Sequence, residues 1–160
     1  MELAKNFDML YYGLERAYDE LEEMCMSLGN YTEHDAFFII GTMIHWVIDC
    51  YERIEKAELL DLEDKEKVSA LKFANNCLKH DVAFLDFQQK ESGATFPQRV
   101  DGSGRFWHYV WKDLNYIKNE RYKSQQKKYD KVLCGKAIIH TFREDMKNIK
   151  LYYEKMIELI

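Results

Sequence analysis

The chain has 160 residues, of which 47% are hydrophobic and 32% charged, and its formal net charge is −5. This composition is typical of one globular domain and excludes a disordered chain. One Pro and seven Gly argue against sandwich and barrel folds, which need many turns, and favour long helices. We therefore expect an all-α fold, an antiparallel four-to-five-helix bundle that forms a single domain over residues 1–160.

Apolar side chains recur at alternating spacings of three and four residues, which is the period of an amphipathic helix. The pattern predicts four main helices, over residues 3–28, 33–57, 63–85 and 130–159. Thr32 followed by Asp35 resembles a capping box at the start of the second helix. This helix is apolar over most of its circumference and is expected at the centre of the bundle. In the third helix, Asn75 stands where the stripe calls for an apolar residue.

Residues 90–105 form the only turn-rich stretch of the sequence. Short apolar runs flank it, which predicts a small β-hairpin or an irregular insertion over about residues 88–107, between the third and fourth main helices. Aromatic residues follow at once, and we expect them to dock the insertion onto the bundle. They are Phe106, Trp107, Tyr109 and Trp111.

Charge is distributed unevenly along the chain. Residues 1–100 carry 10 basic and 20 acidic side chains, whereas residues 101–160 carry 13 basic and 8 acidic ones. Tyrosines alternate with lysines in the most basic stretch, residues 112–136, which suits the phosphates and bases of single-stranded RNA. The candidate RNA-binding residues are Lys118, Arg121, Lys123, Lys127 and Lys128. The alternative is a solvated helix face that neutralises the acidic half of the chain.

One short motif has the residue types for chemistry, Asn75-Asn76-Cys77-Leu78-Lys79-His80 on the third predicted helix. Asn76 and His80 are four residues apart and share one helix face. A histidine both takes and gives protons near neutral pH, which suits acid–base catalysis. The alternative interpretation is a buried polar network of Asn75, Asn76 and His80 that fixes helix register or a dimer interface.

This motif on a late helix of an up-and-down bundle resembles the Arg-polar-x-x-x-His motif of the HEPN superfamily (higher eukaryotes and prokaryotes nucleotide-binding domain). His80 matches the histidine and Asn76 the polar residue, whereas Asn75 stands in the place of the arginine. The resemblance implies metal-independent RNA cleavage, with His80 as the acid/base catalyst and Asn76 orienting the substrate. It also implies a homodimer, and RNA, an antitoxin or another protein as partner in a toxin–antitoxin or phage-defence setting.

The resemblance further implies an acidic residue on an earlier helix that contacts the motif, for which Asp49 and Glu52 are the candidates. Lys79 or Lys72 is the candidate to replace the positive charge that Asn75 lacks, although lysine does not offer the planar fork of arginine. Loss of a charge-stabilising donor commonly costs on the order of 10²–10³ in rate. We therefore expect a weak ribonuclease, or a catalytically inactive helical dimerisation or protein-interaction module.

Other classes of site lack their signatures. His45 with Asp49 and His140 with Glu144 have a spacing that can chelate a metal ion, but the Glu-x-x-His signature of di-iron bundles does not occur. We therefore expect no metal, with His45 in the core and His140 on the surface.

The sequence contains no phosphate-binding glycine loop, C-x-x-C pair or hydrolase motif. It also shows no signal-peptide pattern and no apolar run long enough to span a bilayer. We expect a cytoplasmic protein without cofactors, disulfides or membrane contacts.

Overall fold

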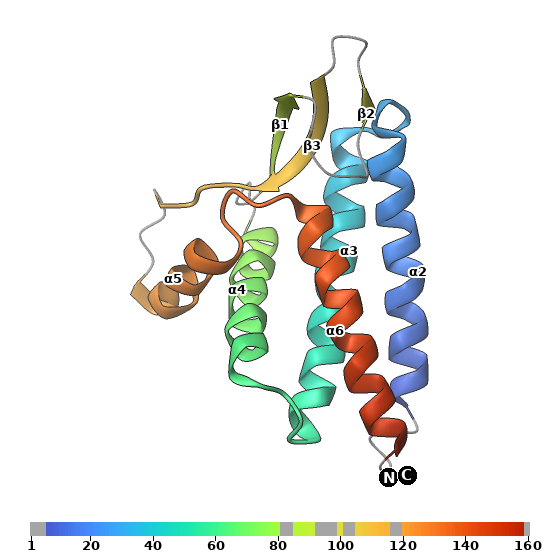
Figure 1. Ribbon diagram of the computed structural model, residues 1–160. Coiled ribbons are helices and arrows are strands. Elements are labelled where there is room, and N and C mark those ends of the chain that lie inside the picture. Colours follow the sequence, from blue (N-terminus) through green and yellow to red (C-terminus); the bar gives the residue numbers. More distant parts are fainter. Residues whose placement is uncertain (1–5, 81–84, 92–98, 101–104, 116–119, 159–160) are drawn as a thin grey trace.

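Five helices and a small sheet make up the part of the chain that the computed structural model describes, residues 6–80, 85–91, 99–100, 105–115 and 120–158 (Figure 1). The helices are α2 (Phe7–Met26), α3 (Glu33–Lys56), α4 (Leu62–Lys79), α5 (Lys123–Val132) and α6 (Ile138–Glu158). The strands are β1 (Leu85–Glu91), β2 (Arg99–Val100) and β3 (Arg105–Trp111), and two short 3-10 turns are η1 (Leu28–Asn30) and η2 (Glu120–Tyr122). The predicted all-α bundle with an insertion after its third main helix is confirmed.

Helices α2, α3, α4 and α6 run up and down beside one another, and α5 lies on the outer side of α4 (Figure 1). Helix α3 contacts α2, α4 and α6, so the most apolar helix is the central one, as its sequence predicts. One core cluster of buried side chains includes residues of all five helices and of β3. A helix that is apolar on several faces gains its stability from such packing rather than from its own propensity.

Side-chain caps explain where α3 and α4 begin. Thr32 Oγ1 accepts a hydrogen bond from the backbone N–H of Asp35 at 3.1 Å, and Asp35 Oδ2 accepts one from the N–H of Thr32 at 2.8 Å. This confirms the predicted capping box. At the start of α4, Asp61 Oδ1 accepts from the N–H of Asp64 at 2.8 Å. Each cap satisfies a helix N–H that has no partner inside the helix, which typically contributes about 1 kcal/mol.

Two predicted helix ranges are wrong. Helix α4 ends at Lys79 rather than at residue 85, because residues 85–91 form an antiparallel ladder with β3 instead of a further helical turn. The predicted helix over residues 130–159 is divided between α5 and α6, with Gly135 between them. Its φ of +76° is in the left-handed region, which glycine adopts readily and which interrupts a helix.

The insertion is a three-stranded sheet with the strand order β1-β3-β2. Strands β1 and β3 pair from Leu85 opposite Trp111 to Glu91 opposite Arg105. The β3 end is fixed to the bundle by backbone hydrogen bonds from Trp111 N–H to the carbonyl of Lys136 at 3.0 Å and from Gly135 N–H to the carbonyl of Trp111 at 2.8 Å. Trp111 is fully buried, so this aromatic residue docks the insertion as expected.

Of the other expected docking residues, Tyr109 is half-buried against the core. The side chains of Phe106 and Trp107 lie outside the described part of the structure. Among the described residues, none of the helices is long and apolar enough to cross a membrane.

Gly13 is expected to be required where α2 meets α3. A Cβ at this position would lie 2.5 Å from two ring atoms of Trp46, whereas a Cβ at Gly41 would lie 3.2 Å from the flexible Leu78 side chain. Both Gly→Ala changes gain the same helix propensity. The difference in stability between the two variants therefore measures the steric clash of the added Cβ with Trp46. We expect Gly13→Ala to be less stable than Gly41→Ala by about 1–3 kcal/mol in urea unfolding. Equal stability of the two variants would contradict this packing.

Candidate nucleic-acid interface

The motif residues 75–80 form the C-terminal end of α4. His80 is the capping residue, and its backbone N–H donates to the carbonyls of Asn76 and Cys77, each at 3.2 Å. Lys79 and His80 are exposed, while Asn75 and Asn76 are half-buried. His80 is thus available to a ligand from solvent and takes no part in a buried polar network.

Cys77, inside the motif, is a packing residue. It is buried, and burial raises the pKa of its thiol to about 11. A thiol with that pKa is almost entirely protonated at neutral pH and is a poor nucleophile. Cys77 is therefore not a candidate for acid–base chemistry at this end of α4.

Asn75, at the position where the resemblance calls for arginine, points its amide oxygen into the protein. Its Oδ1 is buried and has no hydrogen-bond partner among the described residues. A buried acceptor left without a donor typically costs about 1–3 kcal/mol. Asn75 does not supply the positive charge that an arginine would bring.

Helix α5 packs against this end of α4 and runs antiparallel to it. Asn76 Nδ2 donates to Gln125 Oε1 at 3.3 Å, and the rings of Phe73 and Tyr129 lie with their centroids 5.3 Å apart. Gln125 and Tyr129 are one turn apart on α5, so they form a single contact face. The structure therefore brings together the motif and the basic segment, which are about fifty residues apart in the sequence.

Tyr129 anchors α5 in this position. It is fully buried, its hydroxyl donates to the carbonyl of Lys112 at 2.7 Å, and its ring meets the edge of Trp111 at a centroid distance of 6.3 Å. Burial raises the pKa of the Tyr129 hydroxyl, which keeps it protonated as a hydrogen-bond donor. Helix α5 is only ten residues long and depends on such contacts for its stability.

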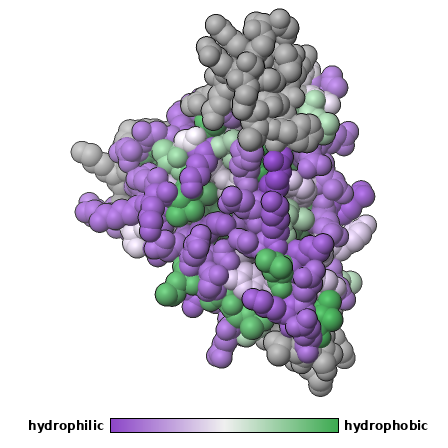
Figure 2. Space-filling model, in the orientation of Figure 1, coloured by the Kyte–Doolittle hydropathy of each residue, from purple (hydrophilic) through white to green (hydrophobic). Residues whose placement is uncertain are grey.

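The outward face of α5 is basic. Lys123, Lys127 and Lys131 are exposed and follow one another every four residues, which sets them about 6 Å apart along the helix. Lys128 is half-buried beside them, and Arg121 is exposed at the start of the helix. Together with Lys79 and His80, these five residues form what we call the α4–α5 basic surface. Most of the side chains over α5, at the left of Figure 2, are hydrophilic.

Two of these lysines have acidic neighbours. The Nζ atom of Lys123 lies 3.7 Å from Glu120 Oε2, and that of Lys131 lies 3.0 Å from Glu66 Oε2. Both pairs are exposed and therefore weak, so a phosphate can compete for either lysine. Lys127 and Lys128 form no ion pair within the described ranges. Lys118, the remaining RNA-binding candidate, lies outside the described residues.

The expected acidic partners of the motif contact a different residue. Glu52 of α3 forms an ion pair with Lys72 of α4 at 2.9 Å, one turn before Asn76. Lys72, the second candidate to replace the motif arginine, is thus partly neutralised by Glu52, in a pair whose side chains are 37% and 42% exposed. Asp49 is largely exposed on α3, and the reduced hydration of its carboxyl group, together with the nearby Glu52, raises the pKa of that group. Neither acid hydrogen-bonds to the motif in the part of the chain that the structure describes.

The candidate metal pairs do not form a site in the described residues. No group of three or more His, Cys, Asp or Glu side chains with metal-binding geometry was found there. His45 is exposed on α3, so its predicted place in the core is wrong. The α3 stripe buries positions on both sides of His45 and leaves this residue facing solvent.

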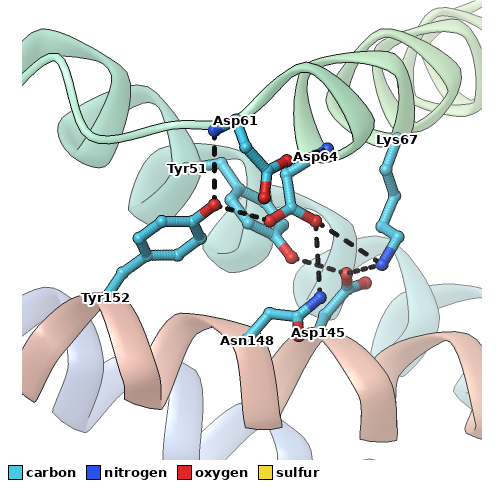
Figure 3. Close-up of polar contacts among 7 residues, drawn as sticks. All are labelled: Tyr51, Asp61, Asp64, Lys67, Asp145, Asn148 and Tyr152. Carbon is cyan, nitrogen blue, oxygen red and sulfur yellow. Dashed lines mark hydrogen bonds and ion pairs between the residues drawn. The ribbon is translucent and has the colours of Figure 1, made fainter.

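A second polar cluster, which the sequence analysis did not identify, lies where α3, α4 and α6 meet (Figure 3). We call it the three-helix junction. Tyr51 donates to Asp145 Oδ1 at 2.8 Å, and Tyr152 donates to Asp64 Oδ2 at 2.8 Å. Lys67 Nζ lies 3.5 Å from Asp145 Oδ1 and 3.8 Å from Asp64 Oδ1, and Asn148 Nδ2 donates to Asp64 Oδ1 at 3.3 Å.

Asp64 and Asp145 each occupy a position of the apolar stripe of their helix. A charged residue at such a position is the signal in the sequence that points to this buried cluster.

Comparison with protein-family models gave no match, and comparisons with curated proteins and with solved structures gave no significant similarity. Among the described residues, the α4–α5 basic surface and the three-helix junction are the two polar clusters from which a function can be inferred. The α4–α5 basic surface is exposed and can meet a macromolecule, whereas the three-helix junction is buried.

Phe73 should control the position of α5. It is 3% exposed and carries the ring contact with Tyr129, so Phe73→Ala should destabilise the protein by about 3–5 kcal/mol and expose the α5 amides to faster hydrogen exchange. Phe38→Ala is the matched control, because Phe38 is 66% exposed on α3. If the α5 amides of Phe73→Ala exchange as slowly as those of the unmodified protein, the contact between Phe73 and Tyr129 does not fix the position of α5.

Proposed function

We propose that this protein binds single-stranded RNA at the α4–α5 basic surface and cleaves it slowly, without a metal ion, through His80. The observation that carries the proposal is the packing of α5 against the motif end of α4, with Asn76 bonded to Gln125. This packing sets a lysine ridge beside an exposed histidine. Phosphate contacts supply most of the affinity of proteins that bind nucleic acid without sequence preference.

The charge of the rest of the chain makes this surface distinctive. The whole chain has a net charge of −5, yet α5 and the residues just before it carry five basic side chains against two acidic ones between positions 120 and 131. A polyanion is repelled by most of an acidic protein and attracted to a local basic patch. Binding is therefore expected to be confined to this surface and to weaken steeply as salt is added.

An aromatic side chain at the edge of the ridge favours a single strand over a duplex. The Arg121 guanidinium lies 5.5 Å from the centroid of the half-buried Tyr122 ring. Unpaired bases stack on tyrosine rings and arginine planes, and such contacts typically contribute about 1–3 kcal/mol per base. A duplex keeps its bases stacked internally and cannot use this contact.

The expected chemistry is slow. His80 is placed to exchange protons with a ribose hydroxyl or a leaving oxygen of a bound strand, while Lys79 offers a positive charge next to it. The Asn76 amide nitrogen is already engaged by Gln125, and Asn75 brings no positive charge to the phosphate. The resemblance to the HEPN superfamily adds two expectations to this proposal, a homodimer and a toxin–antitoxin or phage-defence role with an antitoxin or other protein partner. The scattered cysteines of the sequence add the expectation of a cytoplasmic location.

One observation favours a second candidate, a catalytically inactive helical interaction module. Two polar side chains on the motif face of α4 already have partners within the protein. Asn76 donates a hydrogen bond to Gln125, and Lys72 forms an ion pair with Glu52. In that case the polar end of α4 positions α5 for contact with a protein partner rather than with RNA.

Removing two ridge charges should weaken RNA binding. Lys127→Gln/Lys128→Gln is expected to reduce affinity for a fluorescent oligouridylate on the order of tenfold at 0.1 M salt and to lower the salt slope by about 1.4. The matched control is Lys147→Gln/Lys150→Gln, which removes two exposed charges from α6. Equal effects of the two double variants would mean that only net charge matters, and no binding by the unmodified protein would favour the interaction module.

Cleavage should depend on His80 and not on a metal. With EDTA present, slow cleavage of the oligonucleotide is expected from the unmodified protein and from His34→Ala, which changes an exposed histidine on α3. His80→Ala is expected to lose cleavage but keep RNA binding, because an exposed cap residue contributes little to the fold. Cleavage that persists in His80→Ala would exclude His80 as the acid/base group.

A further inference from the structure

The three-helix junction holds two buried carboxylates for one buried lysine. The Asp145 side chain is fully buried, and those of Asp64 and Lys67 are only 7% and 11% exposed. With both acids ionised, the junction carries a net negative charge away from water. An uncompensated buried charge is costly unless it gains a partner or takes up a proton.

The contacts identify Asp145 as the carboxylate whose negative charge is less well compensated by its neighbours. Asp64 accepts hydrogen bonds from Tyr152 and Asn148 in addition to its ion pair with Lys67. Asp145 Oδ1 accepts a hydrogen bond from Tyr51, and the distance of 3.5 Å between this oxygen and Lys67 Nζ is long for a charge-assisted hydrogen bond. Its second oxygen, Oδ2, is buried and has no partner among the described residues.

We propose that the three-helix junction is a proton-binding site: Asp145 takes up one proton under mildly acidic conditions, and this neutralisation strengthens the attachment of α4 to α3 and α6. The site is independent of RNA binding. Its α4 residues, Asp64 and Lys67, lie in the N-terminal half of that helix, whereas the motif lies at the C-terminal end.

The groups around Asp145 set the direction of the effect. Burial raises the pKa of Asp145 to about 6, against the opposing influence of Lys67 of α4 and Tyr51 of α3, while Asp64 of α4 raises it further. The folded protein thus binds this proton more tightly than the unfolded chain. The resulting stability is fully present below the ordinary pKa of an aspartate and is lost as the pH rises through about 6.

The test compares urea unfolding of the unmodified 160-residue chain with that of Asp145→Asn between pH 5 and 7. Asparagine keeps the shape of the side chain and removes the titration. Relative to Asp145→Asn, the unfolding equilibrium constant of the unmodified protein should rise about tenfold from pH 5 to 7. Asp19→Asn, which changes an exposed acid on α2, should retain the full pH dependence of the unmodified protein.

A direct measurement keeps the proposal testable if Asp145→Asn does not fold. The carboxyl carbon of Asp145 in the unmodified protein, followed by ¹³C NMR, should titrate with a midpoint near pH 6. A midpoint at or below that of exposed aspartates would overturn the proposal. So would identical pH dependence of unfolding in the unmodified protein and a folded Asp145→Asn.

Discussion

Tyr129 packs between Phe73 of α4 and Trp111 of β3, with ring centroids 5.3 and 6.3 Å away, and its hydroxyl bonds to the carbonyl of Lys112. Trp111 in turn meets Phe142 of α6 at 5.8 Å. This aromatic cluster joins the sheet insertion, the motif helix, the basic helix and the last bundle helix. Because α5 is short and highly charged, its place beside the motif depends on this packing, and the proposed RNA surface depends on it as well.

Much of the bundle is predictable from the sequence, because stripe periodicity and caps are local properties. Thr32 with Asp35 and the apolar faces of α2 and α3 are examples. The end of α4 is not, because the apolar period continues through it. At the break between α5 and α6 the apolar period also continues, and Gly135 is the one local signal of a boundary. There the outcome is decided by strand pairing with β3 and by a left-handed backbone position. The spacing of apolar residues indicates which positions are buried, but it does not show where a helix ends and another element begins.

The candidate site was only partly predictable. The motif and the basic segment stand out as residue types, but their contact through Asn76 and Gln125 joins distant parts of the chain, and one sequence offers no signal for it. The same limit applies to Asp64 and Asp145. Each is a charged residue at an apolar stripe position, and their pairing through Lys67 becomes visible only when α4 and α6 are brought together. Helix α4 thus has a buried ionic end and an exposed polar end.

We propose that the exposed end of α4 and the outer face of α5 form one RNA-binding surface. The most direct test of this proposal is amide NMR of the ¹⁵N-labelled 160-residue chain during titration with a single-stranded oligouridylate at low salt. Shift changes concentrated in residues 76–80 and 120–131, and reversed by added salt, are expected. Shift changes concentrated on α2 and α3, or none at all, would contradict the proposal.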